Sequence, residues 1–431
     1  MSAPPEILFL CSRLPFPPNK GDKIRSHALL THLVKTHRVH LACFAESERE
    51  MDEVEKVRAL IGGECLVLPL PARKRYGRMV HGLVHGDAIT AALYTSDELR
   101  DWVKSLCRRR VLAGAVLFGS AMAPCFLEAG TIDPSNVLFD MVDIDSDKWL
   151  QLAARAGWPK SWIYRREARI LLELERKSAA AFGATLLVSP FESASFARLA
   201  PEWAAKIKPL VNGVDWTYFS PGSRQNPYPT GRTIVTMTGH MDYRPNADAA
   251  LWFADEVLPR IRARIPQVCF YAVGSRPPRS LRKRAGDDVA VTGYVDDVRP
   301  YLQHASAVVA PLRIARGLQN KVLEAMAMEK PVIATWEAAR ALATRPGIEI
   351  LIANDAQAFA EAVVEAISGP EGNKIGAAAR RYVRERHDWG TIMGEFDREF
   401  AALTRNGADR SDGRGPGAAP TITMQATALQ H

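Results

Sequence analysis

Short runs of apolar residues alternate with amphipathic segments along most of the chain. Runs of this kind are typical of strands that are buried on both faces of a parallel sheet. The segments between them carry apolar residues at helical spacing, as at Ile24, Ala28 and Leu29. In the first half we expect strands at residues 7–11, 39–44, 65–69, 111–118, 137–139 and 185–189.

The same alternation starts afresh in the second half of the chain. A stretch rich in Pro, Gly, Asn and Ser separates the halves at residues 220–231. Repeated strand, glycine and helix predict an α/β fold of two Rossmann-like, doubly wound domains, 1–222 and 231–385, that face each other across a cleft. Residues 386–405 are predicted to form a further helix, and 406–431 a disordered tail. In the second half we expect strands at residues 233–237, 268–273, 289–292, 305–310 and 331–334.

Basic residues occur in clusters and give the 431-residue chain a formal net charge of +8. Such clusters are either solvated faces or surfaces for an anionic partner. Aromatic residues do not alternate with them, and no RNP, zinc-finger or helix-turn-helix pattern occurs, so nucleic acid is not an expected partner. An anionic membrane surface is an expected partner. The clusters are Arg73 to Arg75 with Arg78, Arg108 to Arg110, Arg165 and Arg166 with Arg169, and Arg282 to Arg284.

Cysteine usage and the lack of long apolar segments indicate a cytoplasmic protein. The six cysteines are scattered, without a CxxC motif or a Cys/His cluster, which fits a reducing compartment. The longest uncharged run, residues 111–127, is shorter than a membrane-spanning helix and contains Gly and Pro. The apolar run near the N-terminus is too short for a signal peptide.

The segment 305–335 holds the strongest chemical signal. A strand leads into a loop with Arg313, Arg316 and Gly317, a helix follows, and the next strand starts after Pro331. Helix N-termini at the carboxyl edge of a parallel sheet present unpaired N–H groups, so we expect an anion there. No G-x-G-x-x-G, P-loop, H-E-x-x-H or G-x-S-x-G motif occurs, which argues against dehydrogenases, P-loop enzymes, zincins and α/β-hydrolases.

Two loops of the first half are also candidates. The loop after the first strand is unusually long and ends at Gly21, where backbone could approach a ligand or another domain, or simply enter a helix. Four aspartates lie between Asp140 and Asp147, but the segment lacks the Gly and Glu of a calcium-binding loop. We interpret it as a helix start with functional carboxylates at Asp140 or Asp143, with simple capping as the alternative.

Four segments form a combined pattern: Asn212-Gly213-Val214-Asp215 with Phe219 and Pro221, Gly239-His240-Met241-Asp242-Tyr243-Arg244-Pro245-Asn246, Val291 to Val295, and Lys321 to Ala327 with Pro331-Val332. Together they resemble the GT-B fold glycosyltransferases of the family-4 type, which transfer a sugar from a nucleoside diphosphate with retention. Two further segments, residues 313–317 and 143–149, are similar, more closely, to the sugar transferases of exosortase/PEP-CTERM systems. The similarity covers roughly residues 6–405.

This resemblance implies roles for individual residues. The first domain would bind the acceptor and the second the donor, and the helix around Trp389 would cross back to the first domain. Glu324 would accept the ribose hydroxyls, although pairing with Lys321 is the alternative. The family's other glutamate falls on Arg316 and a loop glycine on Gln319. The predicted donor-binding set is Gly21, Gly239, Arg244, Gly293, Tyr294, Val295, Gly317, Leu318, Gln319 and Glu324, with Gly239 near phosphate and Gly293 near the base.

The expected chemistry is sugar transfer without a metal or other cofactor. Arg316, Lys321, Arg244 and the N–H groups of residues 317–319 would stabilise the departing diphosphate. Asp143 or Asp140 would orient or deprotonate the acceptor hydroxyl. The sequence thus predicts a retaining glycosyltransferase of exopolysaccharide assembly, with a sugar or lipid-linked acceptor, at the inner face of the membrane. A nucleotide-sugar epimerase and a noncatalytic nucleotide-sugar-binding subunit remain alternatives.

Overall fold

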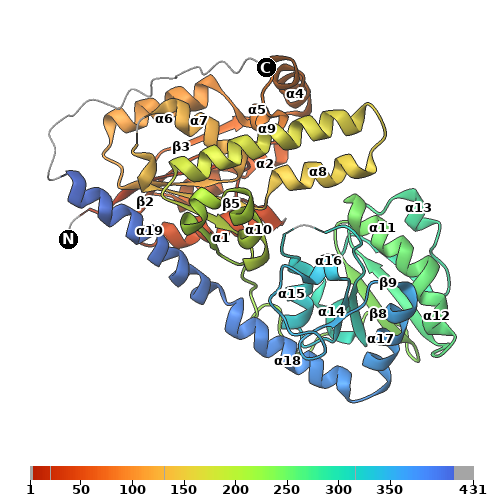
Figure 1. The fold of residues 1–431 in the computed structure, drawn as a ribbon. Coiled ribbons are helices and arrows are strands. Elements are labelled where there is room, and N and C mark those ends of the chain that lie inside the picture. The colour runs from red at the N-terminus through yellow and green to blue at the C-terminus, as the bar shows by residue number, and fades with distance from the viewer. Residues whose placement is uncertain (1–2, 20, 131, 316, 412–431) are drawn as a thin grey trace.

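The chain folds into two lobes, each built on a parallel sheet with helices on both faces (Figure 1). The computed structural model describes residues 3–19, 21–130, 132–315 and 317–411, and side chains to residue 404. Every strand pairs in parallel with its neighbours. Among the described helices, none combines the length and the apolar composition needed to cross a bilayer.

The N-terminal sheet has seven strands in the order β3-β2-β1-β4-β5-β6-β7. The order reverses between β1 and β4, where Ile7 pairs with Gly114, and such a switch point leaves a crevice at the carboxyl ends of the strands. The strands of this sheet are β1 (Glu6–Cys11), β2 (Arg38–Ala45), β3 (Cys65–Pro69), β4 (Gly114–Phe118), β5 (Val137–Val142), β6 (Ala184–Leu187) and β7 (Ile207–Pro209).

Helices cover both faces of this sheet because its strands are apolar on both sides. Leu8 and Leu10 enter one core cluster, and Ile7 and Phe9 enter another. The helices are α1 (Gly21–Leu33), α2 (Glu48–Asp52), α3 (Val54–Leu60), α4 (Ala72–His85), α5 (Ile89–Tyr94), α6 (Asp97–Arg109), α7 (Ala123–Ala129), α8 (Asp145–Arg155), α9 (Lys160–Ala181) and α10 (Pro190–Leu199).

The C-terminal sheet has six strands in the order β10-β9-β8-β11-β12-β13. The order reverses between β8 and β11, as it does between β1 and β4 in the N-terminal sheet. The strands are β8 (Thr233–Thr238), β9 (Val268–Val273), β10 (Val289–Gly293), β11 (Ala307–Ala310), β12 (Val332–Ala334) and β13 (Leu351–Ile352). The helices are α11 (Arg244–Trp252), α12 (Leu258–Arg262), α13 (Arg279–Arg282), α14 (Arg299–His304), α15 (Asn320–Ala327), α16 (Trp336–Ala339), α17 (Ala356–Ser368) and α18 (Glu371–Arg386).

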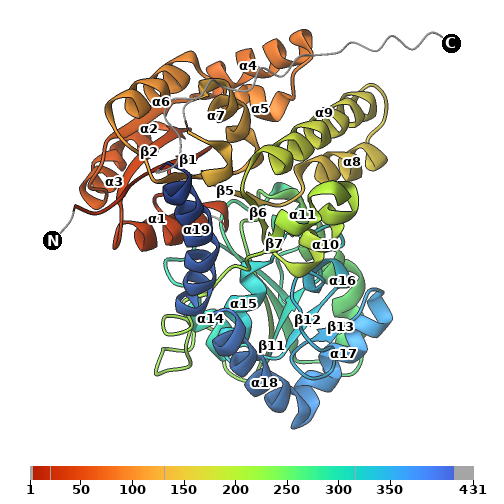
Figure 2. The same ribbon diagram turned by 60° about the vertical axis from the view of Figure 1, so that its left-hand side comes forward.

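The last helix, α19 (Trp389–Ser411), returns to the N-terminal domain (Figure 2). Ile392, Phe396 and Phe400 are buried in the core cluster that contains β1 and β2 residues. An isolated bridge between Val214 and Asp388 places the outgoing and returning chains side by side at the junction. The chain therefore passes between the two lobes twice, once near Val214 and once near Asp388.

Two doubly wound Rossmann-like domains are confirmed, and the details differ at three places. Val111 is 94% exposed and β4 begins only at Gly114. The short edge strand β13 was not expected, because two residues leave no period to detect. Helix α19 continues to Ser411, beyond the end we expected at 405, and the remainder of the predicted tail lies outside the described residues.

Candidate active site

The carboxyl ends of the two sheets meet at the domain junction. His240 Nε2, in the loop after β8, lies 3.2 Å from the carbonyl oxygen of Asn19, in the loop after β1. Asn212, in the linker between β7 and β8 (residues 210–232), donates to Asn320 Oδ1 at the start of α15, at 3.2 Å. The ligand-binding edge of each sheet therefore opens towards the other domain.

Asp143 and Gly317 bring the two domains into contact at this edge. A β-carbon on Gly317 would lie 2.4 Å from Asp143 Oδ1, and Gly317 has φ 58°. That oxygen is buried and has no hydrogen-bond partner among the described residues. Burial, together with the charges of Glu192 and Asp145, raises the pKa of Asp143 to about 7 against the opposing charges of Lys148 and Arg25. A carboxylate with a pKa near neutrality suits acid or base catalysis.

The backbone before Asp143 is strained. Val142 has φ 70°, which is rare for a β-branched residue. The N–H of Asp143 donates to the carbonyl of Met141 at 2.9 Å, so Val142 is the central residue of a γ-turn with positive φ. The register of β5 against β6 also shifts between Asp140 and Val142. Strain of this kind is concentrated at functional sites, and here it directs Asp143 towards the opposite domain.

Three glycines form a row at the carboxyl ends of β8, β9 and β10. Gly239, Gly274 and Gly293 all have positive φ, at 153°, 150° and 73°. A β-carbon on Gly274 would stand 1.7 Å from the carbonyl oxygen of Gly239, and the N–H of Gly274 donates to Gly293 at 3.1 Å. We predicted Gly239 and Gly293 as donor-binding residues but overlooked Gly274, whose place at the end of a predicted strand was the available signal.

Lys321 reaches the first of these glycines. Its Nζ lies 3.1 Å from the position of a β-carbon on Gly239 and donates to Asn246 Oδ1. Asn246 in turn donates to the carbonyl of His240 at 2.8 Å. Burial lowers the pKa of Lys321, and Glu324 opposes that shift. The lysine is thus fixed at a glycine-lined edge where an anion could approach.

Glu324 lies one turn further along α15 and faces a cavity between the domains. Burial raises the pKa of Glu324, and the charge of Lys321 opposes the shift. The cavity is about 690 Å³ in volume and is lined by Glu324 and Asn320 together with residues of α1, the linker and α19. Among the described residues, Glu324 and Lys321 therefore supply a carboxylate and a cation side by side at the junction.

Polar groups also gather at the carboxyl edge of the N-terminal sheet. Ser120, after β4, donates to Asp145 Oδ2 at 2.6 Å. Arg13, after β1, pairs with Asp22 at 2.8 Å and with Glu46 at 3.1 Å. We predicted none of these as site residues, because their partners lie far apart in sequence. They lie at the edge of the N-terminal sheet where the two domains meet.

Asp140 does not face the cleft. It is fully buried, and both of its oxygens accept hydrogen bonds from Arg25, at 2.7 and 3.0 Å. Arg25 also donates to Leu210 O at 2.7 Å and to Asn212 Oδ1 at 3.0 Å. Burial raises the pKa of Asp140, while Arg25 opposes the shift. The pair ties α1 and β5 to the linker, which is a structural role rather than the acceptor-side role that we expected.

The other predicted residues fall into three groups. Arg244 is turned away from the site: its side chain is 89% exposed and pairs with Asp248 at 3.5 Å. Tyr294 is exposed, and Val295 beside it is half-buried. The third group lies at the junction: a β-carbon added to Gly21 would lie 3.7 Å from Asn320 Nδ2, Leu318 is buried, and Gln319 precedes α15. Arg316 lies outside the described residues.

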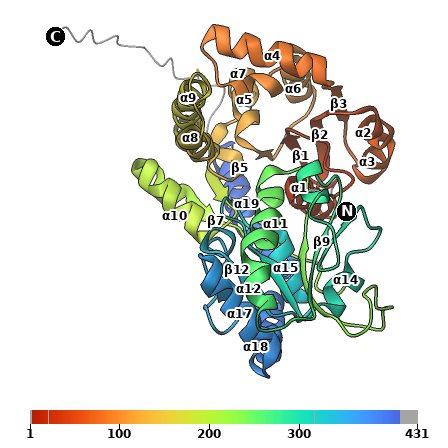
Figure 3. The ribbon, with the colours of Figure 1, turned by 90° about the vertical axis from the view of Figure 1, so that its right-hand side faces the viewer.

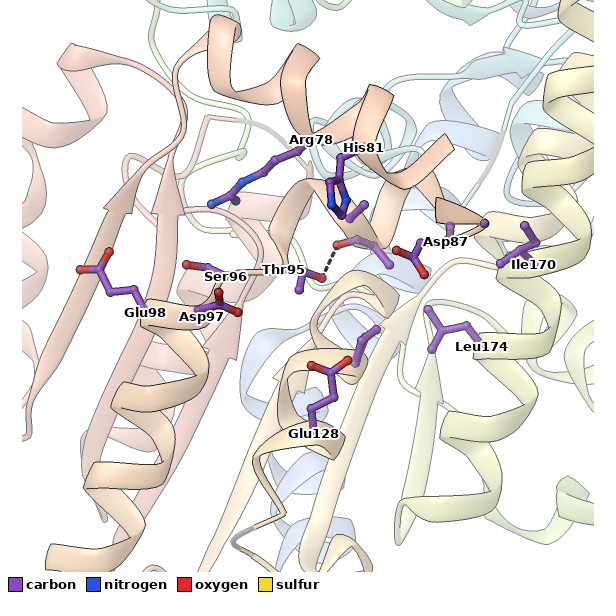
Figure 4. Close-up of a pocket in the computed structure, with 15 residues that line it drawn as sticks. Arg78, His81, Asp87, Thr95, Ser96, Asp97, Glu98, Glu128, Ile170 and Leu174 are labelled. Atoms are coloured by element: carbon purple, nitrogen blue, oxygen red, sulfur yellow. Dashed lines mark hydrogen bonds between the residues drawn. The ribbon is translucent and has the colours of Figure 1, made fainter. Parts of the chain in front are cut away.

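A second cavity of about 690 Å³ lies within the N-terminal domain (Figure 4). Arg78 and His81 extend into it from α4, and Glu128 from α7. Carboxylates dominate its polar lining, with Asp87, Asp97 and Glu98 beside Glu128. None of the residues that we predicted as donor-binding or catalytic lines it.

The arrangement defines a GT-B protein, in which two Rossmann-like domains face each other across their ligand-binding edges. Residues 232–368 match the family model described as Glycosyl transferases group 1. The matched segment contains the glycine row and the Lys321–Glu324 pair. With the fold, it confirms the prediction of a glycosyltransferase.

Solved structures share the fold across nearly the whole chain. HepE from Anabaena in complex with UDP is 14% identical, with a TM-score of 0.63, and the alignment covers 92% of this chain and 100% of that one. Sucrose-phosphate synthase from Thermosynechococcus elongatus is 18% identical, with a TM-score of 0.66 and coverage of 92% and 99%. The trehalose 6-phosphate synthase of Burkholderia multivorans is 13% identical, with a TM-score of 0.64 and coverage of 96% and 100%. No curated protein matches the sequence.

Proposed function

We propose that the chain is a retaining glycosyltransferase that moves a sugar from a nucleoside diphosphate sugar to a lipid-linked acceptor in exopolysaccharide assembly. The observation that carries the proposal is the contact of Asp143 with Gly317 beside the Lys321–Glu324 pair. It brings a carboxylate of one domain to the loop that precedes the predicted nucleotide site of the other. The similar HepE structures hold UDP and UDP-glucose, which supports a nucleotide sugar as donor.

The donor would bind on the C-terminal domain. Glu324 accepts the ribose hydroxyls, and the glycine row lets phosphate and base approach the backbone. Lys321 and the N–H groups of residues 317–319 stabilise the charge that grows on the departing diphosphate. Asn246 fixes the position of Lys321, a role that we had not assigned. These groups supply the charge stabilisation without requiring a metal.

The acceptor would bind against the N-terminal domain. Asp143 orients or deprotonates its hydroxyl, and Ser120, Asp145 and Arg13 supply polar contacts nearby. The sequence resemblance to exosortase-associated transferases suggests an acceptor carried on lipid at the cytoplasmic face of the membrane. The donor sugar enters from the cleft between the domains.

One assay distinguishes this function from its alternatives. The purified protein is incubated with a panel of labelled nucleotide sugars, with and without membrane extract, while nucleoside diphosphate release and lipid-bound label are followed. Transfer of label to lipid supports the proposal. An isomerised donor would instead identify an epimerase, and binding without turnover a noncatalytic subunit.

A further inference from the structure

Helix α4 exposes an apolar stripe although it lies on the surface of the N-terminal domain. Tyr76, Val80 and Val84 follow each other at intervals of four residues, so they share one face of the helix. They are 71%, 61% and 74% exposed. Arg78 and His81, which line the cavity of Figure 4, leave the helix on another side. A stripe of this size on a surface helix indicates a partner.

The tip of the α8–α9 hairpin continues this surface. Trp158 is 86% exposed and Trp162 is 60% exposed. Arg166, one turn after Trp162, donates to the carbonyl oxygens of Asp87 and Leu83 at 3.1 and 3.4 Å, which joins α9 to the end of α4. Figure 3 shows α4 across the top of the molecule with the end of the hairpin beside it.

The charge around these apolar side chains has one sign. Residues 71–86 and 148–166 contain nine Lys and Arg and no Asp or Glu, against a net charge of +8 for the whole chain. Arg73, Lys74, Lys160 and Arg165 are exposed among the apolar residues. The carboxylates that flank these segments are Asp87, just beyond α4, Asp147, and Glu167, which is fully buried. The partner must therefore be both apolar and anionic.

We propose that α4 and the tip of the α8–α9 hairpin dock the protein on a bilayer that contains anionic lipid. A basic helix with an apolar face lies in the plane of a bilayer interface, and Trp side chains prefer that region. Lys and Arg add attraction to the charged headgroups. The surface deepens the proposed function, because it would bring the cleft to a lipid-linked acceptor, but docking itself needs neither donor nor acceptor.

The test uses the full chain and vesicles without any sugar donor or acceptor. Sedimentation is measured with vesicles of phosphatidylglycerol and phosphatidylcholine, and with phosphatidylcholine alone. We expect binding to the anionic vesicles that weakens as salt is raised. The pairs Val80→Ser/Val84→Ser and Arg73→Gln/Lys74→Gln should each lower the partition coefficient about tenfold or more.

Matched substitutions on the other domain control for general loss of charge or apolar surface. Arg282→Gln/Lys283→Gln and Ile348→Ser change exposed residues of the C-terminal domain and should leave vesicle binding unchanged. Nucleoside diphosphate binding and thermal unfolding verify that all variants are folded. Wild-type protein that stays in solution, or α4 variants that bind like wild type, would overturn the proposal. So would ultracentrifugation that finds a dimer disrupted by the α4 pairs, because the surface would then join two copies. Loss of sugar transfer with intact vesicle binding would instead count against the proposed function alone.

Discussion

Asp143 Oδ1 occupies the space that a side chain on Gly317 would need, since a β-carbon there would lie 2.4 Å from it. The carboxylate belongs to the N-terminal domain and the glycine to the C-terminal domain. Gly317 also has φ 58°, a conformation that L-residues with a side chain adopt at a cost. Two independent features therefore require glycine at this position: the space taken by Asp143 and the left-handed backbone conformation.

Gly317→Ala should therefore lower kcat far more than it lowers stability. The left-handed backbone costs roughly 1–2 kcal/mol, and displacement of Asp143 or the loop costs about a hundredfold in rate. Gly347→Ala is the matched control, because Gly347 has φ 79° but no atom within 4 Å of its added β-carbon. Steady-state kinetics and thermal unfolding of both variants check the prediction. Equal losses of kcat in the two would show that the contact with Asp143 is unimportant.

Asp143→Asn should change how stability depends on pH. The pKa of Asp143 is raised from 3.8 to about 7, so the folded state holds its proton more tightly than the unfolded state does. That contribution to stability is complete below pH 3.8 and is lost as pH rises towards 7. The Asn variant, which has no proton to lose, should therefore gain in Tm relative to wild type between pH 5 and pH 8.

The same substitution tests catalysis. If Asp143 is the base, wild-type kcat/KM rises with pH through about 7 as the carboxyl ionises, and the Asn variant loses both the rise and about 10²–10⁴-fold in rate. Asp101→Asn, at an exposed position on α6, should behave like wild type in both assays. An unchanged pH profile in Asp143→Asn would refute the catalytic role.

Glu324→Ala should weaken nucleotide binding. Hydrogen bonds to a charged group are worth about 1.5–3 kcal/mol, so the affinity should fall about tenfold to a hundredfold. Calorimetric titration with a panel of nucleoside diphosphates measures the change. Glu365→Ala, on the exposed face of α17, should bind like wild type. Unchanged affinity in Glu324→Ala would contradict the ribose role.

The fold could be predicted from the sequence because each buried strand has its own local signal. The apolar runs and the glycines at their ends predicted both sheets and two of the three glycines in the row. The site residues were harder to predict, because the direction of a side chain depends on how its helix or strand is packed in the fold. Arg244 and Asn246 are two residues apart on α11 and so point to roughly opposite sides of the helix. Asn246 contacts Lys321, while Arg244 faces solvent.

Asp140 was wrongly predicted as a site residue because its partner lies far away in the sequence. Asp140 and Asp143 looked equivalent in sequence, since both follow the same strand. Arg25, the partner of Asp140, is 115 residues away in the chain, and no local pattern predicts that pair. The γ-turn at Val142 is equally hidden, because Val is not a residue that sequence patterns associate with positive φ.

The Arg25–Asp140 pair leads to a prediction about stability. Removing one member of a buried ion pair leaves an uncompensated charge and costs about 3–5 kcal/mol. Asp140→Ala should therefore lower the free energy of unfolding by this amount in urea titrations. Arg25→Met combined with Asp140→Leu should cost less than the sum of the single changes, because no buried charge remains. Since Asp140 has no exposed surface, the rate per folded molecule at low temperature should change much less than in Asp143→Asn. A large loss of kcat with little loss of stability would return Asp140 to the catalytic site.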